Sequence, residues 1–471
     1  MAELVAIGAC SDGLTGPVVI PPTPPVIASV GVRASLADAL SIAYTVSRAD
    51  SVRAVYRSAD GADSGATPWF AAKEDSIIVL GLRPATQYTV VLQAEHGGAV
   101  TTGARAVQST AALPAALQQV QMTLLAGGAP SGGYTLANVD ASDGHGYAIA
   151  FDSAGVIRWY HDVGATSTGE TKQQANGDIT IYAGETRGFD PFPGAYLEIT
   201  PSGDVVRSIA ATGSPYTDQH ELVTTYDAHG IRIADYLFGY DIRTVDRSAV
   251  GGTSADVVAG HQVLRLSSSG AVDTLVNGWT AWSASDYVDP FSSGDIDHPN
   301  SIDIDRDGGV VVSYRNLDAI VKIDSATHAI VWQLGGARNQ FRFVGDPESG
   351  FGGQHDARIL PNGHLLLFDN GTNHSPQASR AVEYAIDPVA KTATMVWQYV
   401  PQPPVFNTFT GSAQRLANGN TVVSWTLTGV IDEVSPDGTL LSRTQVTTAP
   451  GTPASIYRAT RIRSLYRYSV P

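Results

Sequence analysis

Cysteine is almost absent from this 471-residue chain, and Cys10 is the single one. One cysteine cannot form an internal disulfide, and it excludes metal sites built from several thiolates. Basic residues are also few, with 29 Lys and Arg against 45 Asp and Glu, which gives a net charge of −16. This balance argues against a nucleic-acid-binding protein, which would present a basic face. No apolar run approaches the ~20 residues of a membrane-spanning helix.

Glycine and proline are abundant instead, with 48 and 26 residues, and hydrophobic residues make up 43% of the chain. Charged residues account for only 16%, below the ~25% that is usual for soluble domains. This composition favours a turn-rich, all-β protein with a sizeable core. At about 150 residues per domain, the length predicts two or three units.

The first 26 residues have no pattern of a folded domain. Small and apolar residues precede Cys10, as in the bacterial lipoprotein signal, in which this cysteine is lipidated. The apolar stretch is short and contains Glu3, so we expect a truncated form of a longer signal. The alternative is a disordered N-terminus with a chance cysteine. The lipoprotein interpretation predicts a periplasmic or cell-surface protein, anchored through Cys10 and a proline-rich linker that extends to residue 26.

Residues 27–112 alternate apolar and polar positions in short runs. Residues 41–46 and 88–94 are β-branched and alternate with period two, which predicts strands. Residues 81–88 (GLRPATQY) resemble the tyrosine corner of fibronectin type III modules. We therefore expect a small immunoglobulin-like β-sandwich of this type. It contains no cluster of reactive side chains, which favours a spacer or docking role.

The remaining residues, 113–471, contain a repeat. Units begin near residues 133, 169, 218, 297, 354 and 411, and each contains a glycine turn followed by an apolar β run, as at 309–314 and 363–368. Six such units of about four strands each predict a six-bladed β-propeller. The segment 458–466 is expected to close the ring by pairing near the first blade.

Propeller geometry makes equivalent positions of the innermost strands converge on one central channel. Three histidines, His220, His298 and His355, occupy the same position near the start of three consecutive units. Asn300 lies two residues after His298, so strand alternation aims it the same way. Arg315 follows a central β run. We therefore expect the three histidines and Arg315 to line one end of the channel.

Three functions are compatible with this set. Three imidazoles are typical of a catalytic zinc site; one imidazole can instead be a nucleophile beside an anion site; or the histidines are core residues. A permanent guanidinium at Arg315 is unfavourable beside a divalent metal, but it clamps a sulfate or phosphate group well. The residues therefore favour anion transfer without metal or cofactor.

Several motifs in the propeller together resemble the bacterial arylsulfate sulfotransferase family. They are residues 297–302 (DHPNSI), 313–315 (SYR), 319–324 (AIVKID), 354–358 (QHDAR), 360–363 (LPNG) and 368–371 (FDNG). The resemblance implies a periplasmic six-bladed propeller. It also implies transfer of a sulfuryl group from a phenolic sulfate ester to a phenol, without a nucleotide donor, through a covalent sulfohistidine and with ping-pong kinetics.

The resemblance also implies roles for the channel residues. His355 would be the nucleophile, and His298, Asn300 and Arg315 would bind the sulfuryl oxygens, with His298 also acting as acid or base. His220 would be a further catalytic residue. Some members carry a disulfide near the site, which this chain cannot form, so the loop at 345–350 would be stabilised otherwise or not at all. The alternatives are a metal-dependent hydrolase or lyase and a propeller that only binds a ligand. Donor, acceptor and oligomeric state are not encoded in these motifs.

Overall fold

The computed structural model describes residues 23–164, 167–184, 193–250, 252–288 and 294–467. Cys10 and most of the predicted linker therefore lie outside the described residues. The described chain divides into two compact units, one formed by 23–34, 40–79 and 87–109 and the other by 35–39, 80–86 and 110 onward. None of the helices in the described ranges is long and apolar enough to cross a membrane.

The N-terminal unit is the expected β-sandwich. One sheet has the order β1 (Val26–Leu36), β2 (Ala39–Ser47) and β6 (Ser76–Val79); the other has the order β4 (Ser64–Ala66), β3 (Ser51–Ser58), β7 (Gln87–His96) and β8 (Ala99–Ser109), and β5 (Phe70–Ala71) pairs with β3. Both predicted strands lie within β2 and β7. Along β7 every second side chain is buried, including Tyr88, Val90 and Leu92, because alternate residues of a strand point to opposite faces.

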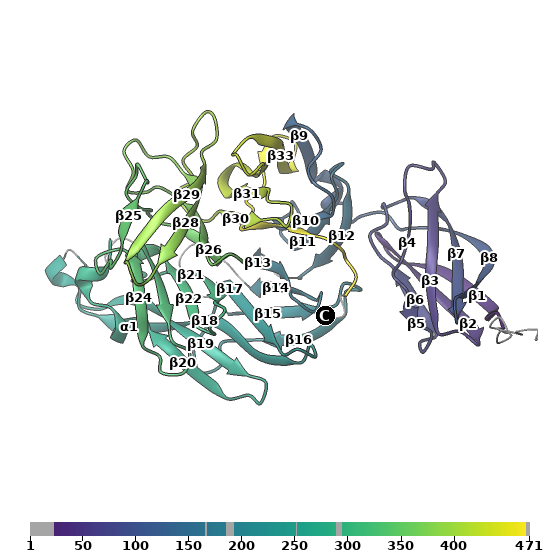
Figure 1. The fold of residues 1–471 in the computed structure, drawn as a ribbon, viewed down its shortest axis with the longest axis horizontal. Coiled ribbons are helices and arrows are strands. Elements are labelled where there is room, and N and C mark those ends of the chain that lie inside the picture. Colours follow the sequence, from purple (N-terminus) through teal and green to yellow (C-terminus); the bar gives the residue numbers. More distant parts are fainter. Residues whose placement is uncertain (1–22, 165–166, 185–192, 251, 289–293, 468–471) are drawn as a thin grey trace, which may run out of the picture. The chain divides into compact units, whose positions relative to one another are not determined.

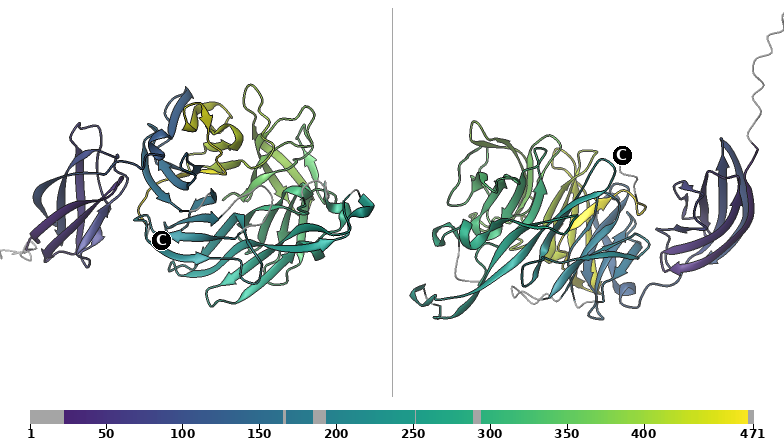
Figure 2. Two further views of the ribbon diagram at one scale, coloured as in Figure 1. Left: turned by 180° about the vertical axis from the view of Figure 1, so that it is seen from behind. Right: turned by 90° about the horizontal axis from the view of Figure 1, so that it is seen from below.

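The second unit contains six sheets arranged around a centre, which is the predicted six-bladed propeller (Figures 1 and 2). In chain order, blades one to three contain β10 (Tyr134–Asp140), β11 (Gly146–Phe151) and β12 (Ile157–Asp162); β13 (Ser167–Gln173), β14 (Ile179–Gly184), β15 (Gly194–Ile199) and β16 (Val205–Ile209); and β17 (Thr217–Tyr226), β18 (Arg232–Val245), β19 (Asp256–Ser267) and β20 (Val272–Asn277).

Blades four to six follow the same pattern, and blades five and six have extra outer strands. They contain β21 (Pro299–Ile304), β22 (Val310–Tyr314), β23 (Ala319–Ile323) and β24 (Ile330–Gly335); β26 (His355–Ile359), β27 (Leu365–Asp369), β28 (Arg380–Asp387), β29 (Thr392–Tyr399) and β25 (Arg342–Val344); and β30 (Ser412–Arg415), β31 (Thr421–Trp425), β32 (Val430–Val434), β33 (Leu440–Ala449) and β34 (Thr452–Pro453). The first strand of each unit begins within about two residues of its predicted start.

The ring is closed by chain segments from both ends of the propeller. Strand β35 (Ala459–Ile462) pairs antiparallel with β10 and becomes the innermost strand of the first blade. Strand β9 (Gln121–Gly127) pairs with β33 on the outside of the last blade. The predicted closure by the C-terminal segment is thus confirmed, whereas the contribution of β9 was not predicted. Both pairings protect sheet edges that would otherwise be open.

Apolar side chains fill the spaces between neighbouring blades. One cluster joins the third and fourth blades, with Phe238, Val263, Val312 and Val321 among its members, and a similar cluster joins the fifth and sixth blades around Phe368 and Trp425. Helices are short: α1 (Gly278–Ala281), η1 (Leu117–Gln119), η2 (Ser248–Val250), η3 (Ala284–Asp286), η4 (Arg315–Leu317) and η5 (Thr426–Thr428). This packing fixes where each innermost strand starts, and the functional side chains are attached there.

Candidate active site

The structure brings the three predicted histidines together. His220 lies on β17, His298 directly precedes β21, and His355 is the first residue of β26. The ring centroids of His220 and His298 are 4.7 Å apart, and those of His298 and His355 are 6.5 Å apart. All three side chains are buried. Their convergence follows from their equivalent positions at the starts of three neighbouring inner strands.

A fourth histidine, His261, belongs to the same cluster. Its ring centroid lies 6.5 Å from that of His298, although His261 comes from β19, the third strand of its blade. The repeat does not predict it, because the equivalent positions lie on first strands and His261 reaches the cluster from farther out in the sheet.

Carboxylates orient His220 and His298. The Nδ1 atom of His220 lies 2.8 Å from Oδ1 of Asp218, and Nδ1 of His298 lies 2.6 Å from Oδ2 of Asp295. An ionised carboxylate only accepts hydrogen bonds, so each Nδ1 carries the proton. Burial lowers the pKa of His298 although Asp295 opposes this shift. His298 is therefore neutral at pH 7, and its Nε2 is a base.

His355 is oriented by two neutral groups. Its Nδ1 lies between two hydrogen-bond acceptors. These are the carbonyl of Gly353 at 2.9 Å and Oδ1 of Asn370 at 2.8 Å. Nδ1 must then donate, which leaves the lone pair on Nε2. The backbone N–H of Thr410 donates to this Nε2 at 3.2 Å. Burial, Arg315 and His298 hold the pKa of His355 well below its usual value, so the imidazole is neutral.

Arg315 supplies a positive charge that the described residues do not neutralise by an ion pair. Nη1 donates to Asn316 at 2.9 Å and Nη2 to the carbonyl of Thr408 at 3.5 Å, while Nε is buried without a partner. The charge is close enough to lower the pKa of both His298 and His355. A partly buried guanidinium with an unused N–H group is suited to bind an anion.

Asn300 is fully buried next to these groups. Its amide nitrogen donates to the carbonyl of Gln354 at 2.8 Å, and its Oδ1 has no partner. One N–H of the Asn300 amide is therefore occupied by a hydrogen bond to the neighbouring blade. This bond links β21 to the start of β26.

Backbone strain is concentrated in the same region. His298 has φ 46° and Thr410 has φ 55°, and Asp356, which follows His355, has φ 55°. These left-handed conformations are costly for residues with a β-carbon, at about 1–3 kcal/mol each, and they gather at functional sites.

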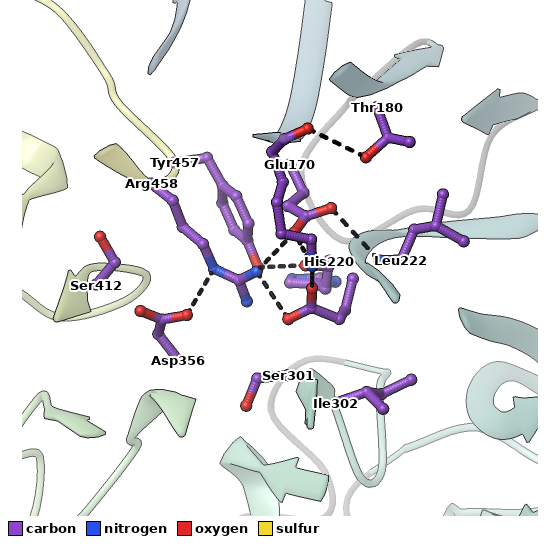
Figure 3. Close-up of polar contacts among 12 residues, drawn as sticks. Glu170, Thr180, His220, Leu222, Ser301, Ile302, Asp356, Ser412, Tyr457 and Arg458 are labelled. Atoms are coloured by element: carbon purple, nitrogen blue, oxygen red, sulfur yellow. Dashed lines mark hydrogen bonds and ion pairs between the residues drawn. The ribbon is translucent and has the colours of Figure 1, made fainter. Parts of the chain in front are cut away.

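A buried layer of charges lies directly beside the histidines. Arg458, the residue before β35, points into a group of carboxylates next to Tyr457 and His220 (Figure 3). Its Nη1 donates to Glu221 at 2.9 Å and Glu170 at 3.2 Å, and its Nε lies 3.3 Å from Asp356. Arg358 and Lys172 also pair with Glu221. We call the six charged residues the Arg458 cluster: Lys172, Glu170, Glu221, Asp356, Arg358 and Arg458. The sequence analysis did not predict this cluster.

A cavity of about 930 Å³ lies on the other side of this cluster. It is lined by residues from the innermost strands of all six blades, including Lys172, Arg358 and Arg415, and by Arg458, but by none of the four histidines. This cavity is thus not the place where the predicted catalytic groups meet, although residues of the Arg458 cluster line it.

One group of side chains among the described residues has the composition of a metal site. It consists of His261, Asp295 and Asp297, whose nearest ligand atoms lie within 4.8 Å of one another. The predicted alternative of a zinc ion held by His220, His298 and His355 does not correspond to this group.

The loop at 345–350 is stabilised without a disulfide. Arg380 donates to Asp346 at 2.9 Å and to the carbonyl of Gly350 at 2.7 Å. The hydroxyl of Tyr384 donates to the same carboxylate at 2.6 Å. A buried ion pair with a neutral donor therefore replaces the covalent link.

Comparison with solved structures gives distant similarities. A protein of unknown function from Bacteroides caccae is 12% identical, with a TM-score of 0.39 over 71% of this chain and 100% of the other. One from Bacteroides thetaiotaomicron is 12% identical, with a TM-score of 0.33 over 91% and 99%. The fn3 domain of human contactin 1 is 20% identical, with a TM-score of 0.18 over 22% and 98%.

A search of curated proteins gave no match. The family model described as arylsulfotransferase (ASST), however, matches residues 128–458. This range contains every blade-forming first strand from β10 to β30, all four histidines and Arg315. It also covers more than half of the chain. The protein therefore belongs to the arylsulfotransferase family, whose chemistry is sulfuryl transfer.

Proposed function

We propose that this protein transfers a sulfuryl group from a phenolic sulfate ester to a phenolic acceptor through a covalent sulfohistidine at His355. The observation that carries the proposal is the tautomer of this residue. Two acceptors bind Nδ1 and one backbone N–H group points at Nε2. His355 is consequently a neutral imidazole with a directed lone pair, which is what nucleophilic catalysis requires.

In the first step, the lone pair of Nε2 attacks the sulfur atom, the N–S bond forms, and the bond between sulfur and the phenolic oxygen breaks. The phenolate leaves as the anion and takes its proton from solvent, because His298 is neutral and its Nε2 has no proton to give. Arg315 binds the sulfuryl oxygens. The N–H group of Thr410, released from Nε2 when the N–S bond forms, becomes a further donor to these oxygens. Donors of this kind stabilise charge in the transition state.

In the second step, the acceptor phenol gives its proton to Nε2 of His298 and its oxygen attacks the sulfur atom. The N–S bond breaks, and its electron pair returns to Nε2 of His355. Nε2 of His298 then releases the proton of the acceptor to solvent, which restores the neutral enzyme and balances the proton taken up by the first phenolate. Because donor and acceptor react in turn at one residue, ping-pong kinetics are expected.

The test is to trap the intermediate. Incubation with a chromogenic aryl sulfate and no acceptor should add one sulfuryl mass to the peptide that contains His355, and added phenol should remove it. His355→Asn should abolish both the adduct and turnover. The matched control is His364→Asn in the same blade, which changes a partly exposed histidine paired with Glu383. An adduct on another residue, or normal transfer by His355→Asn, would defeat the mechanism.

Two further parts of the proposal concern the surroundings of the enzyme. Lipidation at Cys10 would place it in the periplasm or at the cell surface, which labelling with a radioactive fatty acid and the variant Cys10→Ala would test. The competing metal-dependent hydrolase would lose turnover in a chelator and regain it with zinc. A sulfohistidine transferase should keep its activity in the chelator.

A further inference from the structure

His261 lies at the centre of three buried carboxylates. Its Nδ1 is 2.7 Å from Oδ1 of Asp297 and 3.6 Å from Oδ1 of Asp295, and its Nε2 is 3.6 Å from Oδ2 of Asp218. All four side chains are almost completely buried. Nδ1 thus forms a hydrogen bond with Asp297, and Nε2 lies at ion-pair distance from Asp218. A ring with a carboxylate at each nitrogen is stabilised as the imidazolium, which carries a proton on both.

Two of these carboxylates are the groups that orient the catalytic histidines. Asp218 binds Nδ1 of His220 at 2.8 Å, and Asp295 binds Nδ1 of His298 at 2.6 Å. The same carboxylates also accept the backbone N–H groups of these histidines, at 2.8 and 3.2 Å. His261 therefore contacts both supports of the acid–base machinery at once, without touching His355.

We propose that His261 is a positioning residue that remains protonated and holds Asp218 and Asp295 as ionised acceptors, so that His220 and His298 keep their protons on Nδ1. The inference rests on the proposed sulfuryl transfer and deepens it. If either carboxylate took up a proton, the histidine it binds would change tautomer. Its Nε2 would then carry a hydrogen atom and could no longer accept the proton of the phenol.

The surrounding charges agree with a retained proton. Burial alone would lower the pKa of His261, but Asp295, Asp297 and Asp218 raise it well above its usual value. The other titratable groups that face it are Tyr240, whose ring centroid is 4.6 Å away, and His298. Arg315 is near enough to Asp295 to interact with it. Three carboxylates without His261 would leave this buried region strongly negative.

The pH dependence of catalysis tests the role. Removing a positive charge within about 4–6 Å raises the pKa of neighbouring carboxyl and imidazole groups by about 1 unit or more. His261→Gln should therefore shift the acid limb of the kcat/KM profile to higher pH by about 1 unit. At pH values on this limb, its activity relative to the wild type should then be up to about tenfold lower than at pH 9. The control His145→Gln changes a half-exposed histidine paired with Asp162 and should leave the profile unchanged.

A loss of the same size at every pH would mean that His261 only fills space, and unchanged kinetics would also overturn the proposal. A second measurement covers the case in which His261→Gln does not fold. In wild-type protein labelled with ¹⁵N-histidine, one histidine should still carry protons on both ring nitrogens at pH 9, where an ordinary histidine with a pKa of ~6.5 is neutral. Absence of that signal would refute the proposal.

Two measurements distinguish the role of His261 from the proposed sulfuryl transfer and from a metal site. The NMR experiment needs no turnover, so a protonated His261 in a protein that does not transfer sulfuryl groups would refute the proposed function alone. Elemental analysis of purified protein covers the metal alternative. One equivalent of a divalent metal, lost in His261→Gln, would show that His261, Asp295 and Asp297 bind an ion in place of a proton.

Discussion

Replacement of Arg458 by methionine should destabilise the propeller strongly. The arginine side chain is only 3% exposed and pairs with Glu170, Glu221 and Asp356. Methionine keeps much of the volume but leaves three carboxylates with two remaining cations, Arg358 and Lys172. Breaking a buried pair by removing one partner costs about 3–5 kcal/mol. The unfolding entropy of about 340 residues is about 0.7 kcal/mol/K, so the midpoint should fall by about 4–7 °C.

The pH dependence shows whether charge is the cause. Burial and the neighbouring Glu221 raise the pKa of Glu170 to about 7, and loss of Arg458 raises it further. At pH 5 Glu170 is protonated in the folded protein, so one negative charge fewer is left without a partner when Arg458 is removed. At pH 8 the folded variant must either keep Glu170 ionised without Arg458 or take up a proton against the bulk pH, and both are unfavourable. The decrease in midpoint should therefore be larger at pH 8 than at pH 5.

Differential scanning calorimetry of both proteins at the two pH values measures the effect. The control is Arg243→Met, because Arg243 is 45% exposed and pairs with Asp241 at 2.8 Å. A surface pair of this kind contributes below about 1 kcal/mol, so the midpoint should move by less than about 2 °C. An equal decrease for Arg458→Met at pH 5 and pH 8 would indicate lost packing and refute the electrostatic reasoning.

Two further variants test other parts of the structure. Arg315→Lys keeps the positive charge but loses the forked N–H groups, so transfer should fall about 100-fold with an unchanged midpoint; steady-state turnover of an aryl sulfate measures this, and a decrease below about threefold would contradict an anion clamp. Asp346→Asn weakens the ion pair with Arg380, and limited proteolysis should then cleave at 345–350 faster than in the wild type. An unchanged cleavage rate would mean that the hydrogen bonds of Gly350 and Tyr384 are sufficient.

The fold was largely predictable because it follows from local patterns that repeat. Glycine turns and apolar runs recur in each unit, and a repeated unit that cannot bury its own faces must stack on its neighbours. The same regularity located His220, His298 and His355, since equivalent positions converge in a propeller. Strand β9 escaped prediction because it lies outside the repeat and pairs with β33, more than 300 residues away.

The sequence by itself determined the six-bladed fold, the closing strand and three histidines at one end of the inner strands. Only the tertiary structure decided which groups surround them. His261 comes from a third strand, and Arg458 meets Glu170 and Glu221 across blades that are distant in sequence. These contacts depend on side chains that reach across the channel, and no periodicity along one strand encodes them. The tautomer of His355 was equally hidden, because it depends on acceptors at Gly353 and Asn370 that only folding brings to the same nitrogen.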